Sequence, residues 1–205
     1  MQPRTSALPA LISISAWLAL ALVAGASGRL ATLPFPVPQS VLLGLAVVAV
    51  VAGTSVAALR AWLDAVDLRA LVGVHAVRLV AGSYFLYLSG QGQLSAVFAT
   101  RAGWGDIAVA VWAVVVVLSG LPATRRHRGP YLAWNAFGLL DFALVVWTAV
   151  SVGRPDPAAL AVLLRLPLSL LPTFVVPLLI ASHVFIFQRL AALARQEGPP
   201  AGGPP

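Results

Sequence analysis

The segment "ALVGVHAVRLVAGSYFLYLSG", residues 70–90, is an apolar run of membrane-spanning length with a histidine and an arginine in its first half. A helix needs about 17 to 25 residues to cross a hydrocarbon core ~30 Å thick. Comparable runs lie at residues 8–27, 41–60, 106–123, 131–152 and 168–188. The sequence therefore predicts an all-α, polytopic bundle of six transmembrane helices, in which short loops join antiparallel neighbours.

The composition supports a lipid environment. Hydrophobic residues make up 60% of the 205 residues and charged residues 9%, whereas about a quarter of a soluble domain is charged. The lipid bilayer is therefore the predicted partner of the apolar surface. The net charge of +7 does not indicate nucleic-acid binding, because the arginines are spread thinly and form no basic face with interleaved aromatic residues. The absence of cysteine excludes disulfides, thiolate metal sites and thiol catalysis.

The chain is predicted to form one transmembrane domain over residues 1–190, followed by a disordered, Pro/Gly-rich cytoplasmic tail at 191–205. The first run follows Arg4 and precedes "AGA" at 24–26, so we interpret it as a retained signal-anchor helix. Between the runs, "RAWLDAVDLR" at 60–69 is typical of an interfacial helix. The segment "LATLPFPVPQS" at 30–40 predicts an extended loop, and "DPAALAVLLRLP" at 156–167 predicts a short outer helix after Asp156.

The orientation follows from where the arginines lie. The segment "TRRHRG" at 124–129 is the densest basic cluster and is predicted to be cytoplasmic, which puts both termini inside. Eight loop and terminal arginines then lie inside and four outside, namely Arg4, Arg60, Arg69, Arg125, Arg126, Arg128, Arg189 and Arg195 against Arg29, Arg101, Arg154 and Arg165.

Four segments carry a resemblance to other proteins. They are "VRLVAGSYFLYL" at 77–88, "FATRAGWGD" at 98–106, "AWNAFGLLDF" at 133–142 and "LPTFVVPLLIASH" at 171–183. Together they resemble a family of bacterial six-helix polytopic inner-membrane proteins with no assigned function, over about residues 70–190. The resemblance implies a multi-pass protein of a bacterial inner (plasma) membrane, and it implies no reaction.

Five polar residues are predicted to form an interior layer in the cytoplasmic half of the membrane. At ~1.5 Å of helix rise per residue, they lie about 6 to 15 Å in from the cytoplasmic helix ends. They are His75, Arg78, Asn135, Asp141 and His183. An unpaired charge near the bilayer centre is costly, so we predict an ion pair between Arg78 and Asp141. Such a pair either fixes helix packing or serves as a proton or anion site, and the sequence leaves both roles open.

The two histidines suggest an alternative role. His75 lies on a helix that runs outward and His183 on one that runs inward, at matched depth, as axial ligands of a b-type haem would. A structural role for each histidine is the more common arrangement. No metal other than this haem iron is expected, because zinc would need a third or fourth ligand.

Two further motifs have structural interpretations. Pro172 and Pro177 remove backbone donors from the sixth helix, which is therefore predicted to be kinked and to pack against protein or line a cavity. In "RAGWGD" at 101–106, the glycines favour a turn and Asp106 is predicted to cap the outer end of the fourth helix.

No enzyme signature is present: the chain has no HExxH, no paired acidic metal motif and no Gly-rich loop with a lysine. We therefore predict a non-enzymatic integral membrane subunit or small-molecule binding protein, with other membrane subunits as potential partners. Two alternatives stay open. One is a redox protein with a single haem b on His75 and His183, and the other is a small permease in which Asp141 changes protonation against Arg78.

Overall fold

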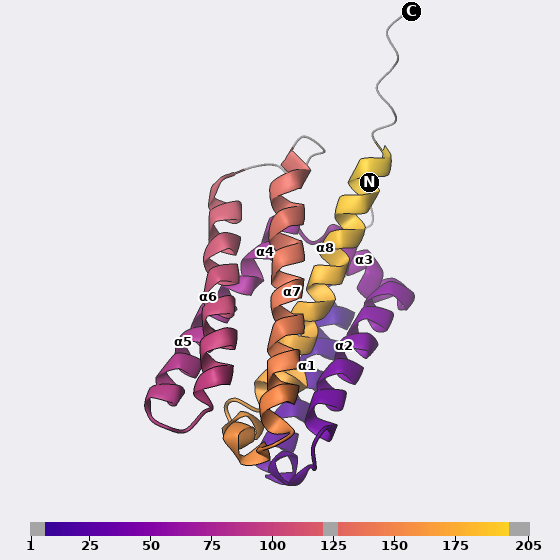
Figure 1. The fold of residues 1–205 in the computed structure, drawn as a ribbon. Helices are drawn as coiled ribbons and strands as arrows, with labels where there is room; N and C mark the ends of the chain where they lie inside the picture. The colour runs from indigo at the N-terminus through magenta and orange to yellow at the C-terminus, as the bar shows by residue number, and fades with distance from the viewer. Residues whose placement is uncertain (1–6, 121–126, 197–205) are drawn as a thin grey trace, which may run out of the picture.

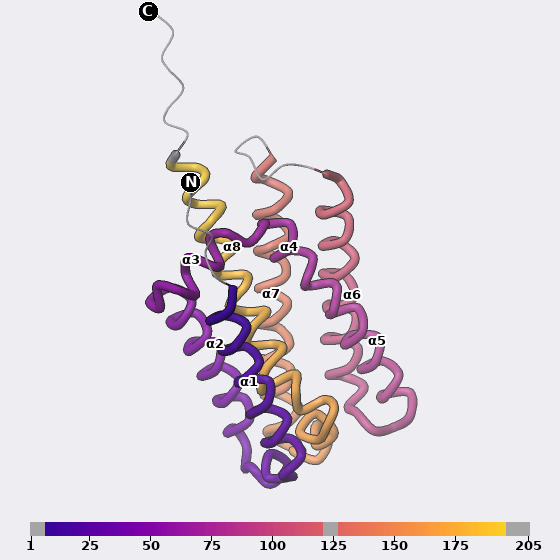
Figure 2. The backbone as a smooth tube through the Cα atoms, turned by 180° about the vertical axis from the view of Figure 1, so that it is seen from behind, coloured from indigo at the N-terminus to yellow at the C-terminus, as the bar shows by residue number. Residues whose placement is uncertain are grey.

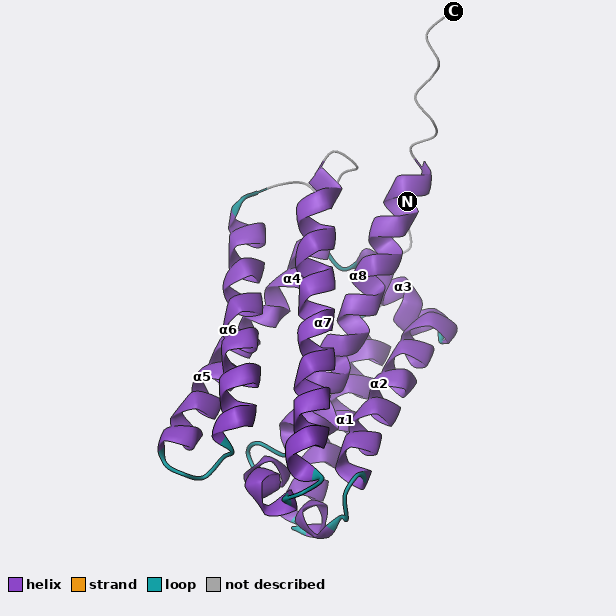
Figure 3. Cartoon of the chain, in the orientation of Figure 1, coloured by secondary structure: helices purple, strands orange, loops and turns teal. Residues whose placement is uncertain are grey.

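The computed structural model describes residues 7–120 and 127–196, and these residues form helices joined by short loops, with no strand (Figure 3). Six helical segments are long and apolar enough to cross a membrane, as predicted. They are α1 (Leu8–Ala26), α2 (Val37–Ser55), α4 to α5 (Leu68–Gly90), α6 (Ala96–Leu118), α7 (Arg128–Gly153) and the segment Leu171–Arg195, most of which is α8 (Val176–Gln196). The chain is thus a multi-pass membrane protein.

The spanning helices form a row in which each packs on its neighbours. Helix α5 packs along α6, α6 along α7, α7 against α8, and α8 against α2 (Figure 1). Seen from behind, α1 lies at the front of the bundle (Figure 2), where it packs on α3 and the first turns of the sixth span. Helix α5 thus stands at one edge of the row and touches mainly α6, which leaves its other side unpaired by a helix.

Short elements join the spans. Helix α3 (Ala57–Ala65) precedes α4 (Leu68–Gly73), whose N-terminus is capped by Asp67 accepting from the Arg69 N–H at 2.8 Å. The predicted outer helix is present as a 3-10 helix, η4 (Pro157–Leu164), capped by Asp156. The Pro-rich segment 30–40 is less extended than predicted, because η1 (Arg29–Thr32) overlaps its start and α2 begins at Val37.

Two boundaries differ from the predictions. The fourth span begins at Ala96, with Ser95 accepting from the Phe98 N–H at 3.4 Å, so it starts ten residues before the predicted position 106. Helix α8 continues to Gln196, so the first six residues of the predicted tail are helical. The rest of that tail, 197–205, and residues 124–126 of the basic segment lie outside the described residues.

Two spans depart from regular α-helix where the sequence carries polar residues or proline. A 3-10 turn, η2 (Val74–Ala76), separates α4 from α5 (Val77–Gly90) and holds His75. The sixth span opens with a π-helical turn, η5 (Leu171–Val175), which contains Pro172. The sequence predicted a kink in this helix; the structure shows a π-helical turn at its start. Single turns of this kind inside longer helices often occur at functional sites.

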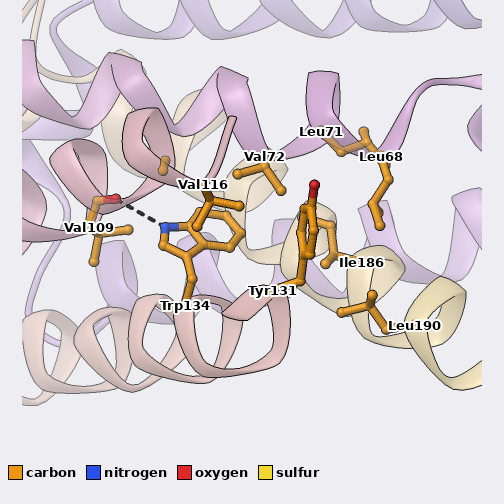
Figure 4. Close-up of a cluster of buried hydrophobic side chains, with 10 residues drawn as sticks. Leu68, Leu71, Val72, Val109, Val116, Tyr131, Trp134, Ile186 and Leu190 are labelled. Carbon is orange, nitrogen blue, oxygen red and sulfur yellow. Dashed lines mark hydrogen bonds between the residues drawn. The ribbon is translucent and has the colours of Figure 1, made fainter. Parts of the chain in front are cut away.

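A dense apolar cluster fills the bundle toward the first turns of α7 and the last turns of α8 (Figure 4). Trp134 is fully buried in this cluster, and its indole Nε1 donates to the Val109 carbonyl at 3.1 Å. We call this cluster the hydrophobic plug; it comprises Leu68, Leu71, Val72, Val109, Ala113, Val116, Tyr131, Trp134, Ile186 and Leu190.

Candidate functional site

A buried arginine between two carboxylates lies at the middle of the bundle. Arg78 of α5 donates through Nε to Asp106 Oδ1 of α6 at 2.6 Å, and through Nη2 to Asp141 Oδ2 of α7. All three residues are buried, with exposed fractions of 1%, 6% and 6% respectively. The Arg78–Asp141 ion pair predicted from the sequence is therefore confirmed. We call Arg78, Asp106 and Asp141 the charged triad.

Neutral groups complete the surroundings of the guanidinium. Nη1 of Arg78 donates to the Gly138 carbonyl at 3.3 Å, and Cζ lies 3.9 Å from the centroid of the Phe142 ring. Each nitrogen of the guanidinium thus has an acceptor on α6 or α7, and one ring face covers the cation. This set of contacts fixes Arg78 in one position.

Glycines make the close approach of these helices possible. A Cβ atom at position 82 would lie 2.5 Å from the Gly103 carbonyl oxygen, so α5 and α6 meet backbone to backbone. A Cβ at position 105 would collide with the Asp141 carboxylate. The glycines of "RAGWGD" therefore permit helix packing inside α6, as small residues commonly do between membrane helices, and form no turn.

This close approach gives a direct test. We expect Gly82→Ala to destabilise the protein by about 1 to 3 kcal/mol. The added methyl group would collide with the Gly103 carbonyl oxygen, and overpacking against a backbone that must shift is costly. Gly44→Ala is the matched control on α2, where a Cβ would meet nothing within 4 Å, and helix propensity there predicts a gain of up to about 1 kcal/mol. Denaturant unfolding in detergent measures both; equal midpoints for the two variants would contradict the close approach.

The two histidines lie in direct contact beside the triad. Their ring centroids are 4.2 Å apart, and both residues are fully buried. His183 Nδ1 is 2.7 Å from Asn135 Oδ1, and Asn135 donates to the His183 carbonyl at 3.0 Å. His75 Nε2 is 2.8 Å from Ser182 Oγ, which itself donates to the Leu179 carbonyl at 2.8 Å.

These contacts assign a tautomer to each ring. Asn135 uses its amide N–H toward the backbone and presents its oxygen to His183, so His183 carries its proton on Nδ1. Ser182 uses its O–H toward Leu179, so it accepts from His75 Nε2–H. The remaining nitrogens, His75 Nδ1 and His183 Nε2, have no hydrogen-bond partner within the described part of the chain. Both imidazoles are therefore neutral in this arrangement.

The arrangement does not fit the haem hypothesis. Axial histidines hold the iron from opposite faces of the porphyrin, so the iron and the macrocycle must lie between the two rings. The 4.2 Å between the centroids of His75 and His183 is the separation of rings that touch. Matched depth along the helices was correctly inferred, but the two helices bring the rings together and leave no space between them.

A partly open cavity of about 310 Å³ lies on the other side of the triad from the hydrophobic plug. Its walls are apolar and come from α2, α5, α7, η4 and the first turns of the sixth span, with Phe85, Val145, Leu168 and Leu171 among them. Arg78 and Asp106 also line it. We call this cavity the chamber and the Arg78–Asp106 pair its charged floor.

The chamber opens sideways at the unpaired edge of α5. Val77, Val80 and Tyr84 line it, and their exposed fractions are 45%, 70% and 38%. In a spanning helix such exposed apolar side chains face lipid, so the opening lies toward the bilayer. The sixth span lines the chamber through Pro172, Val175 and Leu179, as predicted for that helix.

The structure brings all five predicted polar residues into one buried cluster and adds a sixth polar residue, Asp106. His75, Arg78, Asn135, Asp141 and His183 are each at most 6% exposed, and Gly138, beside the His183 ring, joins the histidines to Arg78. The prediction that Asp106 caps a helix end is wrong, because Asp106 lies inside α6 and pairs with Arg78. The signal in the sequence that could have placed Asp106 inside the helix is a series of small residues at helical spacing on both sides of it, all of which are buried: Ala99, Ala102, Gly103, Ala110 and Ala113.

The comparisons with known proteins agree with the family resemblance. No curated protein and no solved structure matches the chain. One family model, described as "Domain of unknown function (DUF8737)", matches residues 35–191 and so covers every residue of the charged triad and of the histidine pair. The chain belongs to this family of unknown function.

Proposed function

We propose that the protein is a non-enzymatic, small-molecule binding protein of a bacterial inner membrane, which takes its ligand from the bilayer into the chamber. The chamber carries this proposal. Ligand pockets are mostly apolar with a few well-placed polar groups and measure roughly 300–1,000 Å³. The chamber has apolar walls, the Arg78–Asp106 pair on its floor and a volume of about 310 Å³.

The orientation is part of the proposal. Arg60, Arg69 and Arg189 belong to the end of the bundle that holds the plug, and Arg154 and Arg165 to the end that holds the chamber. The positive-inside bias then puts the plug and both termini on the cytoplasmic side. On this orientation the chamber lies in the outer half of the membrane.

The hydrophobic plug favours binding over open conduction. It closes the bundle on the far side of the charged floor with side chains such as Trp134, Ile186 and Leu190, each fully buried. A continuous aqueous pathway would have to pass through this packed cluster. A ligand in the chamber therefore has no open path past the charged floor, as expected of a binding site.

Filling the chamber tests the proposal. Ala81 lines the chamber on α5, so Ala81→Trp places an indole inside it. Ala108→Trp is the matched control, since Ala108 is exposed on α6. With the full chain in nanodiscs and neopentylbenzene as a neutral apolar probe, we expect saturable binding to the wild type and to Ala108→Trp. We expect at least about a tenfold loss of affinity in Ala81→Trp. Equal binding to both variants, or none to the wild type, would refute the proposal.

A further inference from the structure

The charged triad has one more carboxylate than it has cations. With Asp106 and Asp141 both ionised, the single guanidinium of Arg78 leaves a net charge of −1 among residues at most 6% exposed. A buried charge without a counter-charge costs several kcal/mol. Neutrality therefore needs one more positive charge at this position.

The neighbouring titratable groups do not supply that charge. Within residues 7–120 and 127–196, the titratable groups that face the triad are the imidazoles of His75, from η2, and His183, from α8. Each donates its one N–H to an oxygen, and the other nitrogen has no acceptor among the described residues to which a second N–H could donate. The balancing charge must be a proton on one carboxylate or a cation brought by a ligand.

The two carboxylates differ in their access to the chamber. Asp106 lines it, whereas Asp141 is not among the residues that line it and packs against the backbone of Gly105. A positive group in the chamber would thus meet Asp106 first. From this geometry we propose that the chamber binds small lipophilic cations, and that each cation takes the place of one proton on the charged triad.

This inference rests on the proposed function. It adds the class of ligand, and it couples ligand binding to the release of a proton. The exchange balances: the carboxylic acid of the triad releases H⁺ to the bulk solvent, the carboxylate remains, and the ligand's fixed positive charge pairs with it. Protonation and cation binding then compete for the same negative charge. The affinity for the cation rises with pH over the range in which the triad loses its proton, and the affinity for a neutral ligand does not.

Three probes of one shape test the charge requirement in the wild type. They are benzyltrimethylammonium, which is a permanent cation, its neutral carbon analogue neopentylbenzene, and the anion phenylmethanesulfonate. In nanodiscs of uncharged lipid we expect the cation to bind at least about tenfold more tightly than the neutral probe, and the anion not to bind. In weak buffer with a pH indicator, cation binding is expected to release about one proton per site, because one elementary charge is exchanged.

Substitutions locate the exchange. In Asp106→Asn we expect the cation to bind no more tightly than the neutral probe and to release no proton. Asp106→Glu, which keeps the charge, is expected to retain cation preference. If Asp106→Asn does not fold, the wild-type comparison of the three probes and the proton release still decide the question.

The outcomes separate the two proposals. Equal affinity of the wild type for cation and neutral probe, or cation binding without proton release, would overturn the inference and leave the chamber as a binding site. Failure of the neutral probe to bind the wild type, or equal affinity for it in Ala81→Trp and Ala108→Trp, would overturn the proposed function itself.

Discussion

Arg78→Met is expected to lower the free energy of unfolding by about 3 to 5 kcal/mol, the cost of leaving a buried charge without its partner. Methionine has an unbranched side chain that fills much of the same space, so the loss reports the charge more than a cavity. In the variant, Asp106 and Asp141 lose their common cation and the Gly138 carbonyl loses a donor. Unfolding of the purified protein in mild detergent, followed by tryptophan fluorescence, measures the change.

The matched control lies on the neighbouring helix. Arg101 is exposed near the start of α6, so Arg101→Met is expected to shift stability by no more than about 0.5 kcal/mol. The triple variant Arg78→Met, Asp106→Asn, Asp141→Asn removes all three charges at once. It is expected to recover much of the lost stability, because neutral replacement of a buried ionic group is often tolerated. An Arg78→Met protein as stable as Arg101→Met would show that the triad is not buried and paired.

The ion pair between Arg78 and Asp141 was predictable because its members are the arginine and the carboxylate placed deepest in apolar runs. A charge in that environment needs a partner, and the sequence offered one at matching depth. The irregular start of the sixth helix was predictable for a similar reason, since Pro172 and Pro177 remove backbone donors whatever the packing.

Asp106 was not predictable by the same reasoning. It follows Gly103 and Gly105, and a glycine pair before an acidic residue is a common signal for a turn and a helix start. In a membrane bundle the same glycines serve close helix packing, and only the contact of α5 with α6 shows which role applies. The first nine residues of α6 are less apolar than those after them, which moved the predicted start of this span from residue 96 to residue 106.

The histidine pair shows a second limit. Helix rise gives the depth of His75 and His183 along the membrane normal, and this depth was enough to place them in one layer. It gives no information on the lateral distance between the helices that carry them. That lateral distance decides whether the two histidines can hold a group between them or instead touch each other. Here the two rings are in contact.

The hydrophobic plug depends on one large side chain, so Trp134→Ala is expected to have the largest effect among apolar substitutions. Trp134 is fully buried, donates to the Val109 carbonyl and makes ring contacts with both histidines, at centroid distances of 4.9 Å and 5.3 Å. In soluble cores Trp→Ala costs about 3 to 5 kcal/mol. In a bilayer the apolar transfer part is small, because lipid tails are as apolar as the core, so we expect about 2 to 3 kcal/mol from lost packing and the lost hydrogen bond.

Lipid-facing tryptophans supply the control for this experiment. Trp104 and Trp147 are 60% and 66% exposed, so their replacement by alanine removes an equal side chain but leaves no cavity, and each is expected to cost less than about 1 kcal/mol. Unfolding in detergent compares the three variants, with helix content followed by circular dichroism because a fluorophore is lost in each. If Trp134→Ala were no more destabilising than the two lipid-facing variants, the plug would not be a packed core. The preference for a binding site over a conduction pathway would then lose its support, because that preference depends on a packed plug that closes the bundle. Trp134 matters to both parts of the interior, since it fills the plug and holds the histidine pair against the charged triad.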